Sequence, residues 1–219
     1  MRVQANWGEG VQFSQFAGAE RLAAKYKLTR EELDTFGYES HVKAAAATKA
    51  GKFDKEIVPL VGKDGKMATK DEGVRADVTL ESMTKLKTLD PKGMITAATS
   101  SQICDGASAM LICNERGLKK LGVKPRAKIH TLALAGSDPR IMLEGPIPAT
   151  QAALKRAGLT INDIGLYEVN EAFAPVPLSW IKALKADPKK MNVNGGACAL
   201  GHPLGATGAL FRVELCAGR

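Results

Sequence analysis

The sequence predicts an α/β fold in which strands and helices alternate in layers, most clearly from about residue 121 onward. Three observations lead to this prediction. Short apolar runs alternate with longer segments of helical periodicity, a pattern typical of layered α/β domains. The chain ends in a strand, a glycine-rich turn and a helix, over residues 191–194, 195–205 and 206 onward. With 219 residues, of which 45% are hydrophobic and 25% charged, the chain can bury a substantial core.

The N-terminal part is expected to be mainly helical. Residues 18–27 have helical periodicity, and Thr29 and Glu32 have the spacing of a capping box at the start of a second helix. The second helix should end near Gly51, because glycine readily adopts the left-handed conformation that terminates many helices. A strand over 56–61, a turn at 62–66, an exposed polar segment to residue 77 and a short helix over 79–86 complete this part.

The remainder of the chain predicts alternating elements. Residues 93–101 and 107–112 indicate two strands joined by a loop, and a basic helix around 118–121 leads to a strand over 127–135. Pro148 suits the first turn of a helix, and Gly158 suits its end. Residues 162–169 indicate another strand, and a helix containing Trp180 comes after it.

Composition and charge exclude several classes of function. No apolar run is long enough to span a bilayer, and residues 1–10 lack the order of a secretion signal, so we expect a cytoplasmic protein with no membrane partner. Four cysteines and three histidines lack the spacing of a zinc site, so no metal is predicted. The net charge of +8 comes from lysines dispersed among acidic residues. No nucleic-acid partner is expected, although a ligand with several phosphates would suit this charge.

The most informative segment is G-G-A-C-A-L-G-H-P-L-G-A-T-G at residues 195–208. Its glycines allow the backbone to approach a ligand closely, and His202 is held between Gly201 and Pro203 in a rigid turn. From the glycine content alone, a ligand site and a tight turn with an incidental histidine explain the segment equally well.

This segment resembles the G-H-P signature of the thiolase family. Three further segments resemble blocks of that family: D-E-G-V-R at 71–75 with T-L-E-S-M at 79–83, S-S-Q-I-C-D-G-A at 100–107, and N-E-A-F at 170–173. The resemblance implies the layered αβαβα thiolase fold, here incomplete, with a mixed sheet flanked by helices. Residues 1–91 would supply the loop region that covers coenzyme A and the remainder of the N-terminal half. Residues 92–120 would be the final strands of that half, and residues 121–219 a truncated C-terminal domain.

The resemblance assigns catalytic roles to His202 and Asn170. In thiolases the G-H-P histidine helps to activate the nucleophilic cysteine and donates to an oxyanion hole, and the N-E-A-F asparagine orients a water that completes an oxyanion hole. Fixed donors aimed at a developing oxyanion stabilise the transition state, each by about 3 kcal/mol. Without the resemblance, Asn170 would be interpreted as a cap of the helix that follows it.

The resemblance also implies contacts to coenzyme A, which would be a substrate or product; no cofactor is predicted. The planar, permanently charged side chain of an arginine suits phosphate binding. Considered alone, Arg75 would be a surface residue and Phe173 a core residue. The residues that match substrate-binding or CoA-binding positions are Arg75 and Ser82 in the loop region and Ser101, Ala172 and Phe173 near the pantetheine arm.

Thiolase chemistry needs one cysteine to accept the acyl group and a second to move a proton. The family places the first before the D-E-x-x-R block, in a part that this sequence does not include, and the second in a C-x-G segment well beyond the G-H-P turn. Cys216 imitates C-x-G but follows His202 too closely, so we interpret the likeness as coincidental. Cys198 is expected to be a buried thiol, and Cys104 and Cys113 match no reactive position.

The predicted function is thiolase-type acyl transfer: thiolytic cleavage of 3-ketoacyl-CoA or Claisen condensation of acetyl-CoA, in fatty acid or lipid metabolism, by an incomplete chain. The S-S-Q variant favours the degradative direction. The alternative is a non-catalytic chain that binds CoA or assembles with another thiolase polypeptide. The expected partners are acyl-CoA and CoA, together with a second copy or another thiolase chain that covers the exposed sheet edges.

Overall fold

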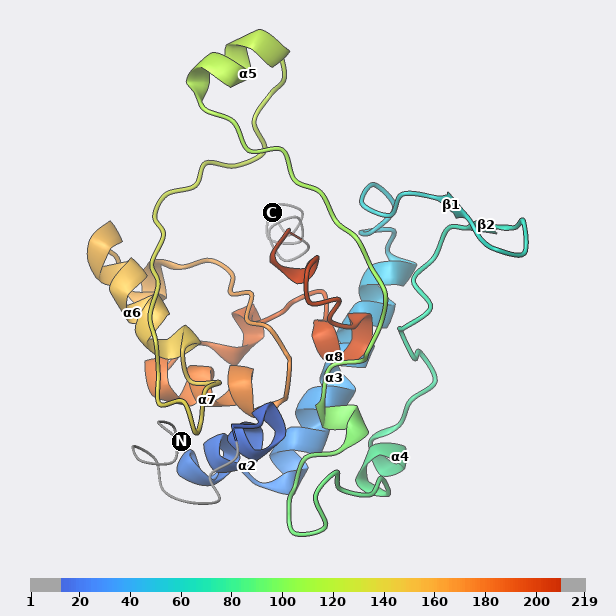
Figure 1. The fold of residues 1–219 in the computed structure, drawn as a ribbon, viewed down its shortest axis with the longest axis vertical. Coiled ribbons are helices and arrows are strands. Elements are labelled where there is room, and N and C mark those ends of the chain that lie inside the picture. The colour runs from blue at the N-terminus through green and yellow to red at the C-terminus, as the bar shows by residue number, and fades with distance from the viewer. Residues whose placement is uncertain (1–12, 210–219) are drawn as a thin grey trace, which may run out of the picture.

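The computed structural model describes residues 13–209, and its body consists of packed helices joined by loops (Figure 1). Helix α2 packs against α7, α3 against α8, and α6 against α7. The elements in chain order are α2 (Gln15–Lys25), α3 (Arg30–Lys49), β1 (Leu60–Val61), β2 (Met67–Ala68), α4 (Leu80–Thr84), the 3₁₀ turn η1 (Ala97–Thr99), α5 (Glu115–Leu121), α6 (Pro146–Ala157), η2 (Ile161–Asp163), α7 (Pro175–Leu184), η3 (Pro188–Lys190) and α8 (Ala197–Leu200).

The main core lies where α2, α3 and α7 meet. Leu22 of α2 and Leu33 of α3 are fully buried, and Trp180 of α7 is 3% exposed. The rings of Tyr167 and Trp180 lie with their centroids 5.1 Å apart. Burial of each large apolar side chain stabilises the fold by about 1.5–3 kcal/mol. This packing holds the segments before and after α7 in place, and both contribute to the candidate site.

The predicted helices are confirmed. Thr29 Oγ1 accepts a hydrogen bond from the Glu32 N–H at 3.2 Å, and Glu32 Oε2 accepts one from the Thr29 N–H at 2.7 Å, which completes the expected capping box of α3. Gly51, just after α3, has a φ of +67°, as a helix-terminating glycine should. The helices expected over 18–27, 79–86, 118–121 and 148–158 and around Trp180 are α2, α4, α5, α6 and α7.

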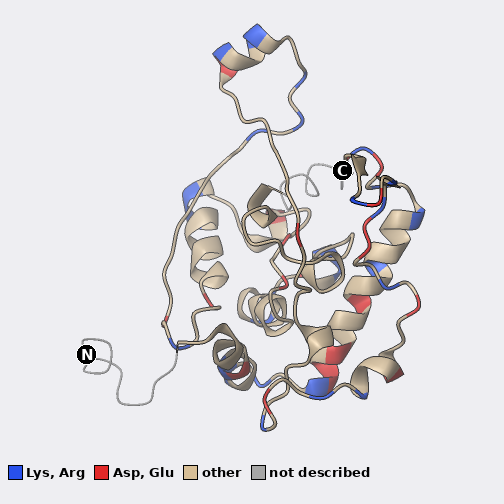
Figure 2. Ribbon diagram, turned by 45° about the vertical axis from the view of Figure 1, so that its right-hand side comes forward, with Lys and Arg blue, Asp and Glu red and all other residues tan. Residues whose placement is uncertain are grey.

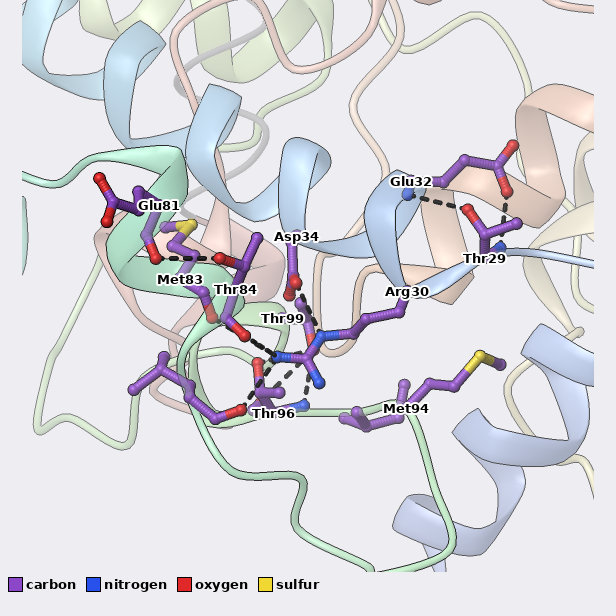
Figure 3. Close-up of polar contacts among 12 residues, drawn as sticks. Thr29, Arg30, Glu32, Asp34, Glu81, Met83, Thr84, Met94, Thr96 and Thr99 are labelled. Atoms are coloured by element: carbon purple, nitrogen blue, oxygen red, sulfur yellow. Dashed lines mark hydrogen bonds and ion pairs between the residues drawn. The ribbon is translucent and has the colours of Figure 1, made fainter.

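Arg30 connects the start of α3 to α4 and the segment after it (Figure 3). Its Nε atom donates to Asp34 Oδ2 at 2.7 Å, and its Nη2 atom donates to the carbonyl oxygens of Leu86 at 3.0 Å and Thr84 at 3.4 Å. The Asp34 carboxyl is buried, and this burial raises its pKa even though the Arg30 guanidinium acts in the opposite direction. The connection fixes the loop region to the helical body.

The sequence predicted more and longer strands than residues 13–209 contain. In the described part only β1 and β2 form a ladder, antiparallel with Leu60 opposite Ala68, so little of the expected strand over 56–61 is paired. The segments 93–101 and 162–169 contain the 3₁₀ turns η1 and η2. What remains of the predicted mixed sheet is a parallel bridge between Tyr167 and Met191 and antiparallel bridges that include Ser100 with Phe173.

The segments 107–112 and 127–135 contain no strand; they belong to two long arms that lead to α5 and back (Figure 1). A strand exists only where a neighbouring chain segment pairs with its backbone N–H and C=O groups. Residues 13–209 offer these two segments no ladder partner. The glycine-rich turn predicted over 195–205 contains the unpredicted helix α8, and only the start of the helix expected after it, at 207–209, lies within the described residues.

No helix in the described range is both long enough and apolar enough to cross a lipid bilayer. In the view of Figure 2, basic and acidic residues are interspersed over the same elements rather than gathered in one basic face. The division of the chain at residues 91 and 120 stays a prediction.

Candidate active site

His202 lies in a turn directly after α8. Gly201 has a φ of +85°, and a side chain at this position would collide with Sγ of Cys104, so the turn requires glycine for both conformation and space. On the other side of the histidine, the Pro203 carbonyl accepts a hydrogen bond from the Thr207 N–H at 3.1 Å. The backbone is therefore fixed on both sides of His202.

Both ring nitrogens of His202 have partners. Nδ1 lies 2.6 Å from Thr207 Oγ1, and Nε2 lies 3.2 Å from Nδ2 of Asn170. The Thr207 hydroxyl donates to the Pro203 carbonyl at 3.1 Å, so it accepts from Nδ1–H, and the lone pair of Nε2 faces the Asn170 amide. Burial lowers the pKa of His202, which favours this neutral ring. The arrangement presents a base, Nε2, in a fixed orientation.

The side-chain amide of Asn170 also provides a hydrogen-bond acceptor, its oxygen. Its Oδ1 atom is buried and has no hydrogen-bond partner among the described residues. Buried polar atoms in proteins are nearly always hydrogen-bonded, so such an atom is a natural binding point for a water or a ligand. Asn170 does not cap the following helix, because the N-cap of α7 is Ala174. That alternative interpretation is wrong.

Backbone pairing holds the segment 170–173 next to the S-S-Q block. Ser100 forms a bridge with Phe173, and the Ser101 N–H donates to the Ala172 carbonyl at 3.0 Å. The structure thus brings Ser101, Ala172 and Phe173 together beside Asn170. The ring of Phe173 is only 4% exposed and meets the Phe16 ring edge-on at 5.3 Å, so it packs in the core.

Arg75 and Ser82 lie in the exposed loop region. The backbone N–H of Arg75 donates to Nδ1 of buried His41 at 3.2 Å. Ser82 caps α4 together with Thr79, whose N–H donates to Ser82 Oγ at 3.2 Å. No hydrogen bond within residues 13–209 joins either residue directly to His202 or Asn170.

A buried carboxylate next to Asn170 went unrecognised in the sequence. Glu171 is 1% exposed; its Oε2 atom accepts from Ser40 Oγ at 2.7 Å and from the Cys198 N–H at 3.0 Å, and its Oε1 atom accepts from Asn192 Nδ2 at 2.8 Å. A side chain at Gly196 would collide with this carboxylate. Burial raises the pKa of Glu171. The network fixes the asparagine segment to α3 and to the start of α8. Glu171 is the second residue of the N-E-A-F block, but nothing in the local sequence indicated that its carboxylate would be buried.

Two of the described cysteines, Cys104 and Cys198, have raised pKa values, which disfavours the thiolate. Burial, reinforced by Glu171, raises the pKa of Cys198 well above its usual range, and Cys198 is a buried thiol as predicted. Cys104 is largely exposed, but its sulfur packs against Gly201 and local burial raises its pKa. Cys113 lies exposed on the arm before α5. Cys216 lies outside the described residues.

Among the described residues, His202 is not part of a metal-binding cluster. Residues 13–209 contain no cluster of three or more His, Cys, Asp or Glu side chains able to bind a metal. Two shallow cavities of about 350 and 360 Å³ lie along α3, and their lining includes neither His202 nor Asn170. The site consists of half-buried His202 and Asn170, which two separate backbone segments hold together.

Family models and relatives agree on what this chain resembles. The model of the thiolase N-terminal domain matches residues 11–116, and that of the thiolase C-terminal domain matches residues 123–217. The steroid 3-ketoacyl-CoA thiolase of Mycobacterium tuberculosis is 51% identical over 205 residues, covering 93% of this chain and 50% of that protein. A 3-ketoacyl-CoA thiolase of a Psychrobacter species is 53% identical over 205 residues, covering 90% of this chain and 53% of that protein.

Solved structures give the same result. Human mitochondrial 3-ketoacyl-CoA thiolase superposes with a TM-score of 0.85 at 41% identity, covering 92% of this chain and 52% of that one. The acetyl-CoA acetyltransferase of Bacillus anthracis superposes with a TM-score of 0.89 at 35% identity, covering 98% and 60%. These neighbours confirm the predicted α/β thiolase-like fold, and the chain spans about half the length of the curated relatives it matches. Both domain models and close sequence relatives therefore establish that the chain belongs to the thiolase family.

Proposed function

We propose that this chain is part of a thiolase-type acyltransferase that cleaves 3-ketoacyl-CoA with CoA or catalyses the reverse condensation. The observation that carries the proposal is the 3.2 Å contact between His202 Nε2 and Asn170 Nδ2, next to the unpartnered Asn170 Oδ1. Two side chains that lie 32 positions apart in the sequence meet at one polar surface. Such a pair can bind the oxygen of a thioester or ketone and the charge that develops on it.

The chemistry follows from these atoms. A thiol would give its proton to Nε2 of His202, and the resulting thiolate would attack the 3-keto carbon of the substrate. The new Nε2–H and the Asn170 amide, directly or through a water, would then stabilise the alkoxide oxygen. Breakage of the C2–C3 bond leaves an acyl thioester on the protein and the enolate of acetyl-CoA, which takes a proton at C2 from a second thiol. The thiolate left on that second group takes the S–H proton of CoA. The CoA thiolate then attacks the acyl group, releases acyl-CoA and regenerates the protein thiolate.

The reactive thiol is proposed to come from outside residues 13–209, because Cys104 and Cys198 have raised pKa values and Cys113 lies on the exposed arm. This observation favours a second candidate function: a chain that binds CoA or assembles with another thiolase polypeptide without turning over substrate. Exposed apolar side chains on the two arms, among them Leu111 at 71% and Leu134 at 96%, support assembly with a second copy or another thiolase chain.

We propose a cytoplasmic role in fatty acid or lipid metabolism, with acyl-CoA and CoA as partners. Free thiols at Cys104, Cys113 and Cys198 suit a reducing compartment. The net charge of +8 suits a ligand that carries phosphates, and exposed Arg75 is proposed to contact the nucleotide. Ser82, Ser101 and the backbone of Ala172 and Phe173 are proposed to contact the rest of CoA.

The test is thiolysis of acetoacetyl-CoA by the purified chain, alone and mixed with two pieces of a relative, its N-terminal half and its C-terminal C-x-G segment, which together supply the two cysteines. We expect turnover only in the mixture, and His202→Ala and Asn170→Ala each to lower kcat by about a hundredfold or more. His130→Ala, on an exposed arm, is the matched control. Turnover by the chain alone that depends on His202 would place the thiol within this chain. CoA binding without turnover in either preparation would favour the assembly function, and His202→Ala with full activity would disprove the catalytic role.

A further inference from the structure

The side chain of Gln102 connects the loop that contains Arg75 to α8, next to His202; within residues 13–209 no hydrogen bond joins Arg75 or Ser82 directly to His202. Its Nε2 atom donates to the Gly73 carbonyl at 2.8 Å, the Ala199 carbonyl at 2.9 Å and the Cys198 carbonyl at 3.2 Å. Gly73 belongs to the D-E-G-V-R loop, and the other two residues belong to α8. A group that faces three carbonyl oxygens must be the donating NH₂ end of the amide, so its orientation follows from its surroundings.

The main chain of Gln102 is part of the same connection. Its N–H donates to the Ala197 carbonyl at 3.3 Å, and its carbonyl accepts from the His202 N–H at 3.1 Å. The last carbonyl groups of any helix lack partners within that helix. Gln102 supplies donors to the end of α8, and then holds the backbone of the histidine that follows α8.

The loop on the far side of Gln102 has few other anchors. Gly73 lies so close to α8 that a side chain there would approach the Ala199 carbonyl to 3.1 Å. Two positions later, the Arg75 N–H donates to His41 Nδ1. Gln102 and His41 thus hold the loop at neighbouring points, and of these two residues only Gln102 also hydrogen-bonds to α8 and to His202.

We propose that Gln102 is a positioning residue that sets the CoA-binding loop around Arg75 and the catalytic His202 in register with each other. This inference rests on the proposed function for its meaning, but the connection itself can be tested without turnover. Loss of the Gln102 donors would release the loop and loosen the turn together, which no residue on either segment alone would do.

The three histidines of the chain allow the test. In NMR spectra of the intact chain, the His202 ring reports on the turn, the His41 ring reports on the loop through its bond to Arg75, and exposed His130 is an internal control. Gln102→Met keeps the length of the side chain and removes its donors. Gln151→Met, on the exposed face of α6, is the matched control variant.

We expect Gln102→Met to shift the ring signals of both His202 and His41, to leave His130 unchanged, and to weaken CoA binding about tenfold by calorimetry. Gln102→Glu should resemble Gln102→Met at neutral pH, because its carboxylate would face three carbonyl oxygens. Compared with the unaltered chain at the same pH, it should recover partly at acidic pH, where a protonated carboxyl donates again. Gln151→Met should change nothing.

A melting curve by circular dichroism separates local release from unfolding. If Gln102→Met lowers the melting temperature so far that the chain unfolds, the pH-dependent recovery of Gln102→Glu decides. Unchanged signals from His202 and His41 in a folded variant, or a shift of only one of them, would overturn the inference. Absence of CoA binding by the unaltered chain would instead count against the proposed function and leave the histidine comparison valid.

Discussion

The hydroxyl of Thr207 lies 2.6 Å from Nδ1 of His202, within the same turn. Since the hydroxyl also donates to the Pro203 carbonyl, it fixes which ring nitrogen carries the proton. We predict that Thr207→Val, in a catalytically complete assembly, lowers kcat for thiolysis about tenfold or more with little change in KM. Thr207→Ser should retain most of the activity, because it keeps the acceptor.

The ring itself provides a second measurement of this contact. In Thr207→Val, nitrogen chemical shifts should show a mixture of the two neutral tautomers of His202, whereas the unaltered chain should show one, protonated at Nδ1. A single unchanged tautomer in the valine variant would contradict the prediction.

Buried His41 makes stability depend on pH. Burial, with a smaller contribution from Arg75, lowers its pKa, so the unfolded chain binds the proton more readily than the folded one. The stabilising contribution is therefore complete above the unfolded pKa of about 6.5 and is lost as the pH falls towards the lower folded pKa. His202 acts in the same direction, so two groups share the effect. We expect His41→Gln to reduce the loss of stability between about pH 8 and about pH 5.

Urea denaturation at several pH values measures this effect. Glutamine can still accept from the Arg75 N–H but does not titrate in this range, so the variant separates the hydrogen bond from the charge. Exposed His130→Gln is the control and should leave the pH profile unaltered. An unchanged profile for His41→Gln would disprove the assignment.

Local signals in the sequence were sufficient for the helices from α2 to α7, although not for the short α8, because caps and terminating glycines act within a few residues. Thr29 with Glu32, and Gly51, mark α3 in the sequence as they do in the structure. Strands were overpredicted because an apolar run such as 107–112 becomes a strand only when another segment pairs with it. The local sequence of such a run does not indicate whether another segment pairs with it.

The candidate site was predictable where a motif names the residue that performs the chemistry. His202 and Asn170 were both expected, and they meet. The residues that position them were not expected, since Glu171 and Gln102 act through burial and backbone contacts. Phe173 shows the reverse: its motif suggested a ligand contact, but its ring lies in the core. The roles of Glu171, Gln102 and Phe173 depend on contacts between segments that are distant in the sequence, and hydrophobic periodicity does not reveal these contacts.

The side chain of Asn192 hydrogen-bonds to the backbone of Val169, as a neighbouring strand would do. Its Oδ1 atom accepts from the Val169 N–H at 2.9 Å, and its Nδ2 atom donates to the Val169 carbonyl at 2.9 Å and to Glu171. We predict that Asn192→Ala destabilises the fold by about 3 kcal/mol, since it leaves buried groups unpaired. Asn192→Asp should be worse, because it places a second carboxylate beside Glu171.

Chemical denaturation monitored by intrinsic tryptophan fluorescence would measure both changes, with Asn114→Ala at the exposed cap of α5 as the control. Asn192→Asp should regain stability as the pH falls and its carboxyl is protonated. Equal stability of the aspartate and alanine variants at all pH values would contradict the role of charge.

The ion pair between Arg30 and Asp34 predicts that loss of Arg30 lowers the stability of the fold more when Asp34 keeps its charge than when it does not (Figure 3). Arg30→Ala leaves a buried carboxylate unpaired and removes the donors to the carbonyls after α4, so it should cost about 3–5 kcal/mol at neutral pH. The cost should shrink in acid, because burial already raises the Asp34 pKa and the carboxyl can be protonated. Arg30→Ala combined with Asp34→Asn should be more stable than Arg30→Ala alone, because the buried charge is gone. Urea midpoints of the two variants at neutral pH measure this difference, and equal midpoints would show that the charge of Asp34 is not what Arg30 compensates.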